Sequence, residues 1–409
     1  MTRSSRSRPA PYWVAIAVFW LLSTALYVVH LFAGFMPDRV LFRLPLLELD
    51  VYWYGFLIMS GIALGSWVVS ALARERGEAA LREAVPAAVR TQPLTVLDGA
   101  EAEDAEAGEK KMPAQIQQHL ARYHIRTIGD LLLQWGFDPR ALGLNQAGRD
   151  EVATRLQRLP GIAPAWLQNP PWRQWNPEHV WSGVLWCTIF AIIGARLYHV
   201  LTPSPSMAAL GINSPLDYLR NPMQLFNLRN GGLGIYGGIA GGIIGLLIYA
   251  HRQRMRALPW ADLAGIGVAL GQWVGRWGNF FNQELYGRPS NAPWAVTISP
   301  AYRLPAYADV SRFHPAFLYE SLWNFLAFLV LYTLYRRHSS RLRDGDLTAL
   351  YLILYAVGRI LLEFVRLDSR EMTLFGLHLP VATTVSLGII ALMVAWRAWV
   401  RRTPRRSTP

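Results

Sequence analysis

Gly-Arg-Trp-Gly-Asn-Phe-Phe-Asn-Gln-Glu-Leu-Tyr-Gly occupies residues 275–287, at the end of an apolar stretch that is long enough to cross a bilayer. The segment carries an arginine, two asparagines and a glutamate, which are Arg276, Asn279, Asn282 and Glu284. Such side chains are costly at membrane depth and usually face the inside of a helix bundle or a water-filled cavity. The segment therefore predicts a helical membrane protein in which one span ends in a functional polar cluster.

The composition of the chain points to the same class. Of its 409 residues 52% are apolar, 17 are Trp and 17 are Tyr, and runs of about 20 apolar residues recur along it. These runs lack the alternation of a transmembrane β-barrel. The net charge of +13 comes largely from arginine clusters beside apolar runs. That pattern carries topology information, and we expect no nucleic-acid partner.

We predict eight membrane spans of about 20 residues each. They cover residues 11–34, 51–73, 179–200, 231–250, 259–281, 314–336, 347–366 and 380–400. The arginine clusters fall on one side of the membrane if both termini are cytoplasmic, as the positive-inside rule requires. A cleaved signal peptide is the competing interpretation of residues 1–34. The length of the apolar run and the lack of a clear cleavage site favour a retained anchor.

Residues 76–175 interrupt the pattern of spans. An acidic run at 98–109 predicts a solvated tether, and the helical spacing of apolar residues after it, as at Ile116 and Leu120, predicts a small helical subdomain. Residues 159–162, Leu-Pro-Gly-Ile, resemble a helix-hairpin-helix turn, but the negative charge nearby argues against nucleic-acid binding. We expect a cytoplasmic linker followed by this subdomain.

The predicted orientation places three polar strings at one depth near the outer leaflet. They end the fifth span, open the sixth and close the seventh, and they comprise Arg276, Asn279, Asn282, Glu284, His314, Glu320, Arg359, Glu363 and Arg366. Packing has no need of a guanidinium at Arg276, whereas bidentate recognition of a phosphate does. For His314, a capping or network role is as plausible as catalysis.

In the seventh span, Arg359, Glu363 and Arg366 are spaced i, i+4 and i+7, so we expect them on one helical face, which Tyr355 extends. A structural ion pair between Glu363 and one arginine is the simple interpretation. Because two arginines flank a single carboxylate, one positive charge would remain for an anionic ligand. Glycines such as Gly271 are most simply explained by close helix packing.

Six motifs in order resemble the prolipoprotein diacylglyceryl transferase family of bacterial inner membranes. They lie within 51–73 and 179–398 and are Tyr52-Trp53-Tyr54-Gly55, Gly194-Ala195-Arg196-Leu197-Tyr198, Gly231 to Gly238, Gly275 to Gly287, His314 to Glu320, and Gly358 to Arg366. The resemblance implies transfer of the diacylglyceryl group of phosphatidylglycerol to the lipobox cysteine thiol of a prolipoprotein. A thioether forms, glycerol phosphate leaves, and no cofactor or metal is required.

The resemblance also implies roles for individual residues. Arg276, Arg359 and Tyr236 are the expected catalytic residues, although Tyr236 stands where some members of the family have histidine. The identity of the base that activates the thiol therefore stays open. Substrate binding is expected from the other motif positions, which are Tyr54, Arg196, Gly237, Asn279, Asn282, Glu284, Gly287, His314, Glu320, Tyr355, Glu363 and Arg366.

Together these inferences predict an all-α polytopic protein of the bacterial cytoplasmic membrane, with an extracytoplasmic head, an active site toward the outer leaflet and cytoplasmic termini. About eight helices comprise a seven-helix family core and an extra N-terminal helix. The expected parts are that helix with its outer loop (1–50), the first core helix (51–75), the cytoplasmic insertion (76–175), the transmembrane catalytic core (176–400) and a basic cytoplasmic tail (401–409). A lipid-binding transporter or scaffold without chemistry is the alternative, but no internal repeat supports a transporter.

Overall fold

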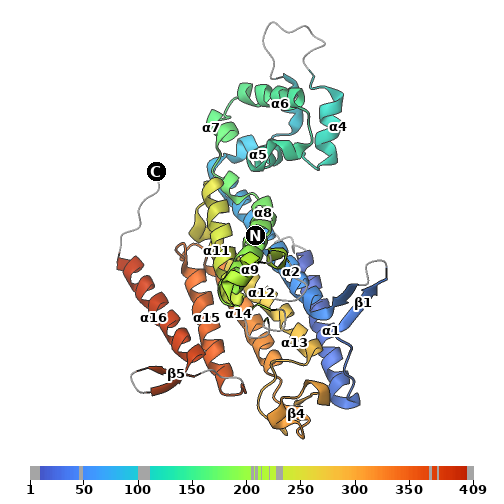
Figure 1. Ribbon diagram of the computed structural model, residues 1–409. Coiled ribbons are helices and arrows are strands. Elements are labelled where there is room, and N and C mark those ends of the chain that lie inside the picture. The colour runs from blue at the N-terminus through green and yellow to red at the C-terminus, as the bar shows by residue number, and fades with distance from the viewer. Residues whose placement is uncertain are drawn as a thin grey trace. The chain divides into compact units, whose positions relative to one another are not determined.

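The computed structural model describes residues 10–45, 49–99, 111–203, 207, 211–212, 214–220, 222–226, 234–367, 371–374 and 377–402. Figure 1 shows the order of its helices and strands along the chain. Internal contacts divide the chain into two units. The core unit comprises Met1–Val69 and Leu258–Pro409, and the inserted unit comprises Ser70–Ala257.

The described part of the chain is mostly helical, and its strands form three two-stranded antiparallel sheets, so the predicted all-α class is confirmed. Five described helices are long and apolar enough to cross a membrane, which are α1 (Pro11–Ala33), α2 (Trp53–Ala84), α8 (Glu178–Leu201), α14 (Ala316–His338) and α16 (Val381–Arg402). Three further helices occupy the other expected spans, which are α11 (Ile235–Arg252), α12 (Ala257–Gly275) and α15 (Asp346–Glu363). The count of eight spans stays a prediction.

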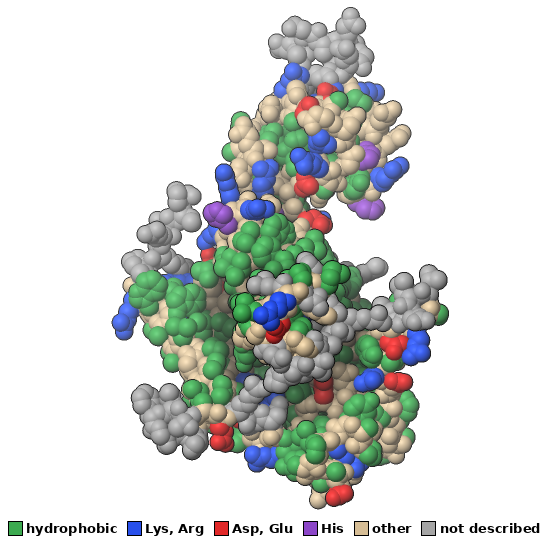
Figure 2. Space-filling model, in the orientation of Figure 1, with side chains coloured by type: hydrophobic (Ala, Val, Ile, Leu, Met, Phe, Trp, Pro, Cys, Tyr) green, Lys and Arg blue, Asp and Glu red, His purple; other side chains and the backbone are tan. Residues whose placement is uncertain are grey.

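Large apolar side chains stand exposed on these helices. Leu21, Leu22 and Phe32 of α1 and Leu392 and Trp399 of α16 are all more than half exposed. Figure 2 shows a patch of hydrophobic side chains over α16. Exposed apolar surface of this extent on long helices is what contact with lipid requires.

In the core unit, short elements outside the long helices surround the polar residues. The strand pairs are β1 (Val40–Leu44) with β2 (Leu49–Tyr52), β3 (Val296–Thr297) with β4 (Arg312–Phe313), and β5 (Glu371–Leu374) with β6 (Leu377–Pro380). The short helices are α13 (Trp277–Asn282), η5 (Pro300–Tyr302) and η6 (Pro305–Tyr307). Helix α15 packs against both α14 and α16.

Glycines bring α2 and α12 into backbone contact. A Cβ on Gly61 would lie 2.6 Å from the carbonyl oxygen of Gly271, and Gly65 faces Gly267 in the same way one turn further along. Small residues at such spacing let helix axes approach closely where lipid supplies no hydrophobic driving force. The packing role expected for Gly271 is therefore confirmed.

Helix α1 packs on the core unit through aromatic rings. Trp20 and Phe325 both lie against Trp273, with ring centroids 5.9 and 4.6 Å from it. Near the start of the helix the hydroxyl groups of Tyr12 and Tyr332 are hydrogen bonded at 2.8 Å. This aromatic contact fixes α1 to α12 and α14.

The inserted unit contains the end of α2 and a group of short helices. These are α3 (Ala87–Arg90), η1 (Leu94–Gly99), α4 (Ala114–Arg122), α5 (Ile128–Phe137), η2 (Pro139–Leu142), α6 (Gln146–Arg158), α7 (Pro164–Gln168) and η3 (Arg173–Trp175). Leu120, Leu132 and Trp172 are completely buried among them. The guanidinium of Arg155 is also buried, and it bonds to the carboxylate of Glu151 at 2.5 Å.

Helices α8 and α11 complete the inserted unit, with α9 (Pro215–Arg220) and α10 (Met223–Phe226) between them in the chain. Gly194 of α8 and Gly237 of α11 meet backbone to backbone. The close approach expected of the glycine-rich run is therefore observed at Gly237, while residues 231–233 of that run lie outside the described residues.

Three helix limits differ from the expected spans. Helix α2 continues eleven residues past residue 73, because its sequence remains rich in helix-forming Ala, Glu and Arg. The fifth span is divided at Arg276, which separates α12 from α13. Helix α15 ends at Glu363, so Arg366 lies beyond the helix in a bridge with Gly287. The expectation of one helical face carrying Arg359, Glu363 and Arg366 is wrong for Arg366.

Candidate functional site

The signature segment 275–287 folds as a broken helix followed by a tight turn. Arg276 is the residue before α13, and Gln283 and Leu285 have left-handed backbone φ angles of 53° and 55°. The carboxylate of Glu284 accepts hydrogen bonds from the side-chain amides of Asn279, at 2.9 Å, and Asn282, at 3.2 Å. One carboxylate thus fixes both asparagines, because the turn folds it back onto α13.

Glu320 lies between two guanidinium groups. Its Oε2 atom is 2.6 Å from Arg276 Nε, and its Oε1 atom is 3.8 Å from Arg366 Nη1. The Glu320 side chain is only 8% exposed, whereas that of Arg276 is 29% exposed. A buried carboxylate needs such cationic partners, and here it holds the Arg276 guanidinium in place while leaving part of it accessible.

Arg359 has a separate carboxylate partner. Its Nη1 atom donates a hydrogen bond of 2.7 Å to Glu363 Oε2, four residues along α15. The simple expectation of an ion pair between Glu363 and one arginine is therefore confirmed. The other oxygen, Glu363 Oε1, is buried and has no hydrogen-bond partner among the described residues. An unpaired buried acceptor is unfavourable, which makes this carboxylate a place where an added donor would bind.

Arg276 and Arg359 line the same small cavity. Its volume is about 20 Å³, and its walls are Arg276, Glu320, Trp323, Asn324, Tyr355, Gly358, Arg359 and Leu362. Helices α14 and α15 approach closely here, because a Cβ on Gly358 would collide with the indole of Trp323. Tyr355, expected from the sequence to line the site, does so.

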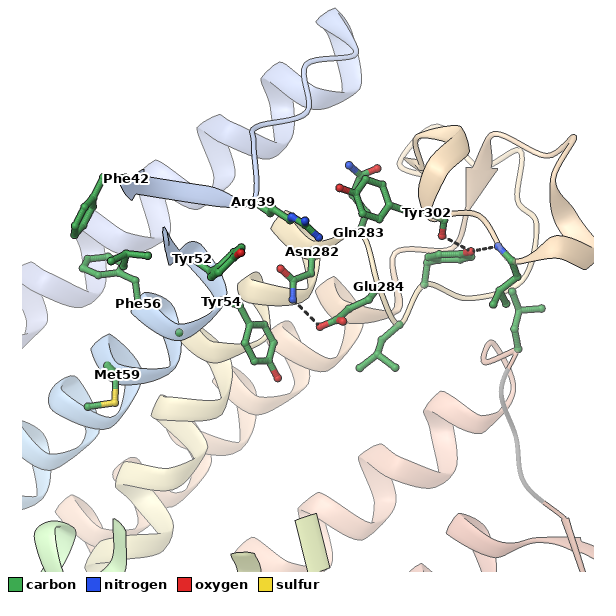
Figure 3. A pocket seen from close by; sticks show the side chains of 16 residues that line it. Arg39, Phe42, Tyr52, Tyr54, Phe56, Met59, Asn282, Gln283, Glu284 and Tyr302 are labelled. Carbon is green, nitrogen blue, oxygen red and sulfur yellow. Dashed lines mark hydrogen bonds between the residues drawn. The ribbon is translucent and has the colours of Figure 1, made fainter. Parts of the chain in front are cut away.

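A larger pocket of about 1080 Å³ lies beside the Asn282–Glu284 turn (Figure 3). It is lined by Arg39, Phe42, Val51, Tyr52, Tyr54, Gly55, Phe56, Met59, Asn282, Gln283, Glu284, Leu285, Tyr286, Tyr302, Leu304 and Leu367. Figure 3 shows Tyr54, Asn282 and Glu284 close together, with Phe42, Phe56 and Met59 on the side of the hairpin and α2. The pocket therefore joins a polar end to an apolar wall, as sites for amphiphilic ligands do.

Tyr54 packs against the signature segment. Its ring occupies the space that a side chain at Gly278 would need, since a Cβ there would lie 2.7 Å from Tyr54 Cδ2. The glycine at 278 is therefore required for the tyrosine to lie where it does. Sequence motifs more than 200 residues apart meet at this contact.

Gly287 and His314 are joined through their backbones. The Gly287 amide donates to the His314 carbonyl oxygen at 2.8 Å. A Cβ on Gly287 would lie 2.6 Å from the carbonyl oxygen of Val365, so only glycine fits. The ring of His314 contacts a third group, because its Nδ1 atom is 3.0 Å from the hydroxyl of Tyr319. His314 therefore takes part in a hydrogen-bond network, and Glu320 of the same motif pairs with Arg276.

The remaining predicted site residues belong to the inserted unit. Arg196 is buried and donates to the carbonyl oxygens of Leu225, at 2.9 Å, and Gln224, and its guanidinium lies over the ring of Tyr218. These contacts fix the chain after α8. Tyr236 is 65% exposed at the start of α11, with its ring 5.9 Å from that of Tyr198. The residue is therefore largely accessible.

Arg39 lines the larger pocket, and Trp294 and Tyr319 are hydrogen bonded next to His314, but none of the three was among the expected residues. Tyr319 stands inside the His314–Glu320 motif, so its position next to Glu320 was a usable signal. Arg39 and Trp294 lie outside every motif, and only the folded hairpin and the segment between α13 and β3 place them there. Among the described residues no group of three or more His, Cys, Asp or Glu side chains could hold a metal ion.

Known proteins share this sequence pattern. A protein named phosphatidylglycerol--prolipoprotein diacylglyceryl transferase from Frankia alni is 43% identical over 216 residues, which are 52% of this chain and 54% of the relative. Proteins of the same name from Chloroflexus aggregans and Trichormus variabilis are each 39% identical, over 48% and 57% of this chain. The matches span 65% and 79% of those two relatives, whereas the chain covers only about half of the length of the Frankia alni protein.

The sequence model of one family also matches, under the description prolipoprotein diacylglyceryl transferase. It covers residues 161–399, which include α12 to α15. The range contains all the paired side chains of the site, which are Arg276, Glu320, Arg359, Glu363 and Arg366. Helix α1 and the β1–β2 hairpin precede the matched range. The match extends over more than half of the chain, and the chain belongs to this family.

Proposed function

We propose that the protein transfers the diacylglyceryl group of phosphatidylglycerol to the thiol of the lipobox cysteine in the signal peptide of a prolipoprotein. The observation that carries the proposal is the pair of guanidiniums at one cavity. Arg276 and Arg359 both line it, and each is held by its own carboxylate. Fixed guanidiniums in a site that is poor in water are suited to a phosphate that gains charge as it departs.

The proposed reaction is a displacement at carbon. The cysteine sulfur attacks the glyceryl carbon that bears the phosphate, a C–S bond forms, and the C–O bond to the phosphate breaks. The electron pair of that bond leaves on glycerol phosphate, and the thiol gives up its proton to a base. The same positive field favours the incoming thiolate, because cationic neighbours lower the pKa of a thiol.

The carboxylates act as positioning groups in this scheme. Glu320 and Glu363 restrain the two arginines before substrate arrives, so little reorganisation is needed during the reaction. Glu284 does the same for Asn279 and Asn282, whose amides would bind the glycerol headgroup or the peptide. The apolar wall of the larger pocket would accommodate an acyl chain beside that polar end.

Tyr236 is proposed to hold the thiol or the lipid rather than to take the proton. A phenol is a poor base near neutral pH, and its hydroxyl is a good hydrogen-bond donor. We also propose that the protein lies in the bacterial inner membrane with this site toward the outer leaflet. Both termini and residues 76–175 would then be cytoplasmic, as the arginine clusters favour.

A transfer assay tests the proposal directly. The full chain is purified, placed in vesicles of phosphatidylglycerol and phosphatidylethanolamine, and given a lipobox peptide. We expect mass spectrometry to detect the diacylglyceryl thioether with wild-type protein. A peptide with serine in place of the cysteine is the matched control and should stay unmodified. Binding of phosphatidylglycerol without thioether formation would favour the scaffold alternative and contradict the proposed reaction.

A further inference from the structure

We propose that helix α1 is a positioning element for His314. In this proposal Tyr27 and His30 hold the outer segment 294–297, and Trp294 of that segment fixes the imidazole of His314 through the hydroxyl of Tyr319. The inference rests on the proposed function only in assigning His314 to substrate binding. It gives a role to a helix that precedes the range matched by the family model.

Two buried side chains of α1 hold the backbone of the outer segment. The hydroxyl of Tyr27 donates to the carbonyl oxygen of Trp294 at 2.8 Å. The amide of Thr297 donates to His30 Nε2 at 3.1 Å. Since Nε2 accepts, the proton of a neutral imidazole is on Nδ1, which donates to the carbonyl oxygen of Phe35 at 3.0 Å. Tyr27 and His30 are 7% and 2% exposed, so water competes little for these bonds.

The outer segment in turn fixes the ring of His314. The indole Nε1 of Trp294 can only donate, and it lies 2.8 Å from the hydroxyl oxygen of Tyr319. That oxygen therefore accepts, and the hydroxyl proton is available to the His314 Nδ1 atom at 3.0 Å. In the proposed arrangement Nδ1 accepts this proton, so a neutral His314 carries its own proton on Nε2. The tautomer is set by a bond that begins on Trp294.

The backbone provides a second connection between the same parts. Thr297 of β3 pairs with Arg312 of β4, and Val296 pairs with Phe313, the residue before His314. The amide of His314 itself donates to the carbonyl oxygen of Arg288 at 2.9 Å. The strand that leads into His314 is thus paired with a segment that α1 holds.

This arrangement gives His314 a directed donor. The structure shows no acceptor for its Nε2 atom among the described residues, and the atom is not enclosed. Tyr319, which holds the ring, directly precedes Glu320, the carboxylate paired with Arg276. A neutral N–H at this place would donate a hydrogen bond to a phosphate oxygen of the lipid.

Conservative variants test this series of hydrogen bonds, from Tyr27 through Trp294 and Tyr319 to His314 and here called the relay, in the transfer assay. Tyr27→Phe, Trp294→Phe and Tyr319→Phe each remove one hydrogen bond and keep an aromatic ring. We expect kcat/KM to fall about threefold to tenfold in each, the size of one hydrogen bond. Tyr12→Phe is the matched control, because it removes a buried hydroxyl contact from the same helix, to Tyr332, and it should leave kcat/KM unchanged.

Coupling separates positioning from general stability. In a His314→Gln background, Tyr27→Phe should cause no further loss, because the residue through which it acts is gone. Effects that multiply instead would overturn the proposal. The thermal midpoint of each variant shows whether it is folded. If Tyr27→Phe unfolds, Tyr319→Phe takes its place in the double-mutant cycle with His314→Gln, because Tyr319 contacts His314 directly.

The tautomer is measured independently of activity. Solid-state NMR of protein labelled with ¹⁵N-histidine, with His314 assigned by its loss in His314→Gln, should show a protonated Nε2 in the wild type and a mixture of tautomers in Tyr319→Phe. A proton on Nδ1 in the wild type would overturn the relay. If the wild type forms no thioether, the proposed function fails, while the spectrum still decides whether α1 sets the tautomer.

Discussion

Arg276 and Arg359 face one cavity but depend on different carboxylates, Glu320 at 2.6 Å and Glu363 at 2.7 Å. The two arginines come from different parts of the chain, one before α13 and the other within α15. Because each guanidinium has its own partner, loss of one pair leaves the other intact. The contributions of the two arginines can therefore be measured separately.

We predict that Arg276→Ala and Arg359→Ala each lower the transfer rate by roughly 100-fold or more, because a fixed charge that stabilises a leaving group contributes at that level. Lysine at position 276 should restore little activity, since it lacks the planar fork. The measurement is thioether formation by protein whose membrane insertion has been verified. Arg341→Ala, an exposed arginine between α14 and α15, is the control. Near wild-type turnover by either alanine variant would remove the assignment.

We predict that Glu320→Gln harms the enzyme more than Glu363→Gln. Glu320 faces both Arg276 and Arg366, whereas Glu363 contacts Arg359. Neutralising Glu320 leaves two partly buried guanidiniums without their shared partner, which we expect to lower the thermal midpoint as well as kcat. Both quantities are measured in the same detergent. Equal effects of the two substitutions would contradict a shared role for Glu320.

We predict that Gly287→Ala destabilises the protein by about 1–3 kcal/mol, the usual cost of forcing an extra carbon into a packed site. Its Cβ would lie 2.6 Å from Val365 O and 2.9 Å from His314 Cβ. Gly388→Ala is the matched control, because a Cβ there meets no atom within 4 Å. The measurement is the thermal midpoint of unfolding of the two variants. Equal midpoints would show that the backbone around Gly287 adapts to the added carbon and would contradict the prediction.

We predict that Tyr236→Phe keeps a measurable fraction of activity and that Tyr236→His is tolerated. The hydroxyl is exposed at the start of α11 and in our proposal only positions substrate. The pH profile of kcat should then follow the thiol of the peptide in both proteins. A correctly inserted Phe variant as inactive as Arg276→Ala would make the hydroxyl catalytic.

We predict that replacing residues 80–172 by a short flexible joint leaves detectable transfer activity, because every motif lies outside this range. A labelling reagent that cannot cross the membrane should fail to reach Lys111 from the outer face. Reaction of Lys111 from that side would contradict the proposed topology. Complete loss of activity in a well-folded deletion would give the insertion a part in the reaction.

The sequence was sufficient for the class of fold and for the charged residues near Arg276 and Arg359. Apolar runs and arginine clusters are strong local signals, and ionisable residues inside such runs are rarely accidental. The limits of the spans were less predictable. The helix is broken at Arg276, whose guanidinium pairs with Glu320 on another helix, and that contact joins residues far apart in the chain.

Residues that act through partners distant in sequence were also missed. Arg366 was expected on the face of α15. The helix ends three residues earlier, at Glu363, and the backbone of Arg366 pairs with Gly287. Trp294 lies outside every motif of the sequence. Its importance depends on Tyr27 and Tyr319, which lie 267 and 25 residues away. Such coupling becomes visible only when the chain is folded.

The contact between α2 and α12 has a consequence for how these positions can vary between species. Where Gly61 meets Gly271 the touching atoms belong to the backbone, so no change of rotamer can relieve an added side chain. A substitution at either position is then excluded unless the partner helix moves. Such a movement would displace Tyr54 from Gly278. Conservation of glycine at positions 61 and 271 would therefore reflect the geometry of the pocket rather than any chemical role of these glycines.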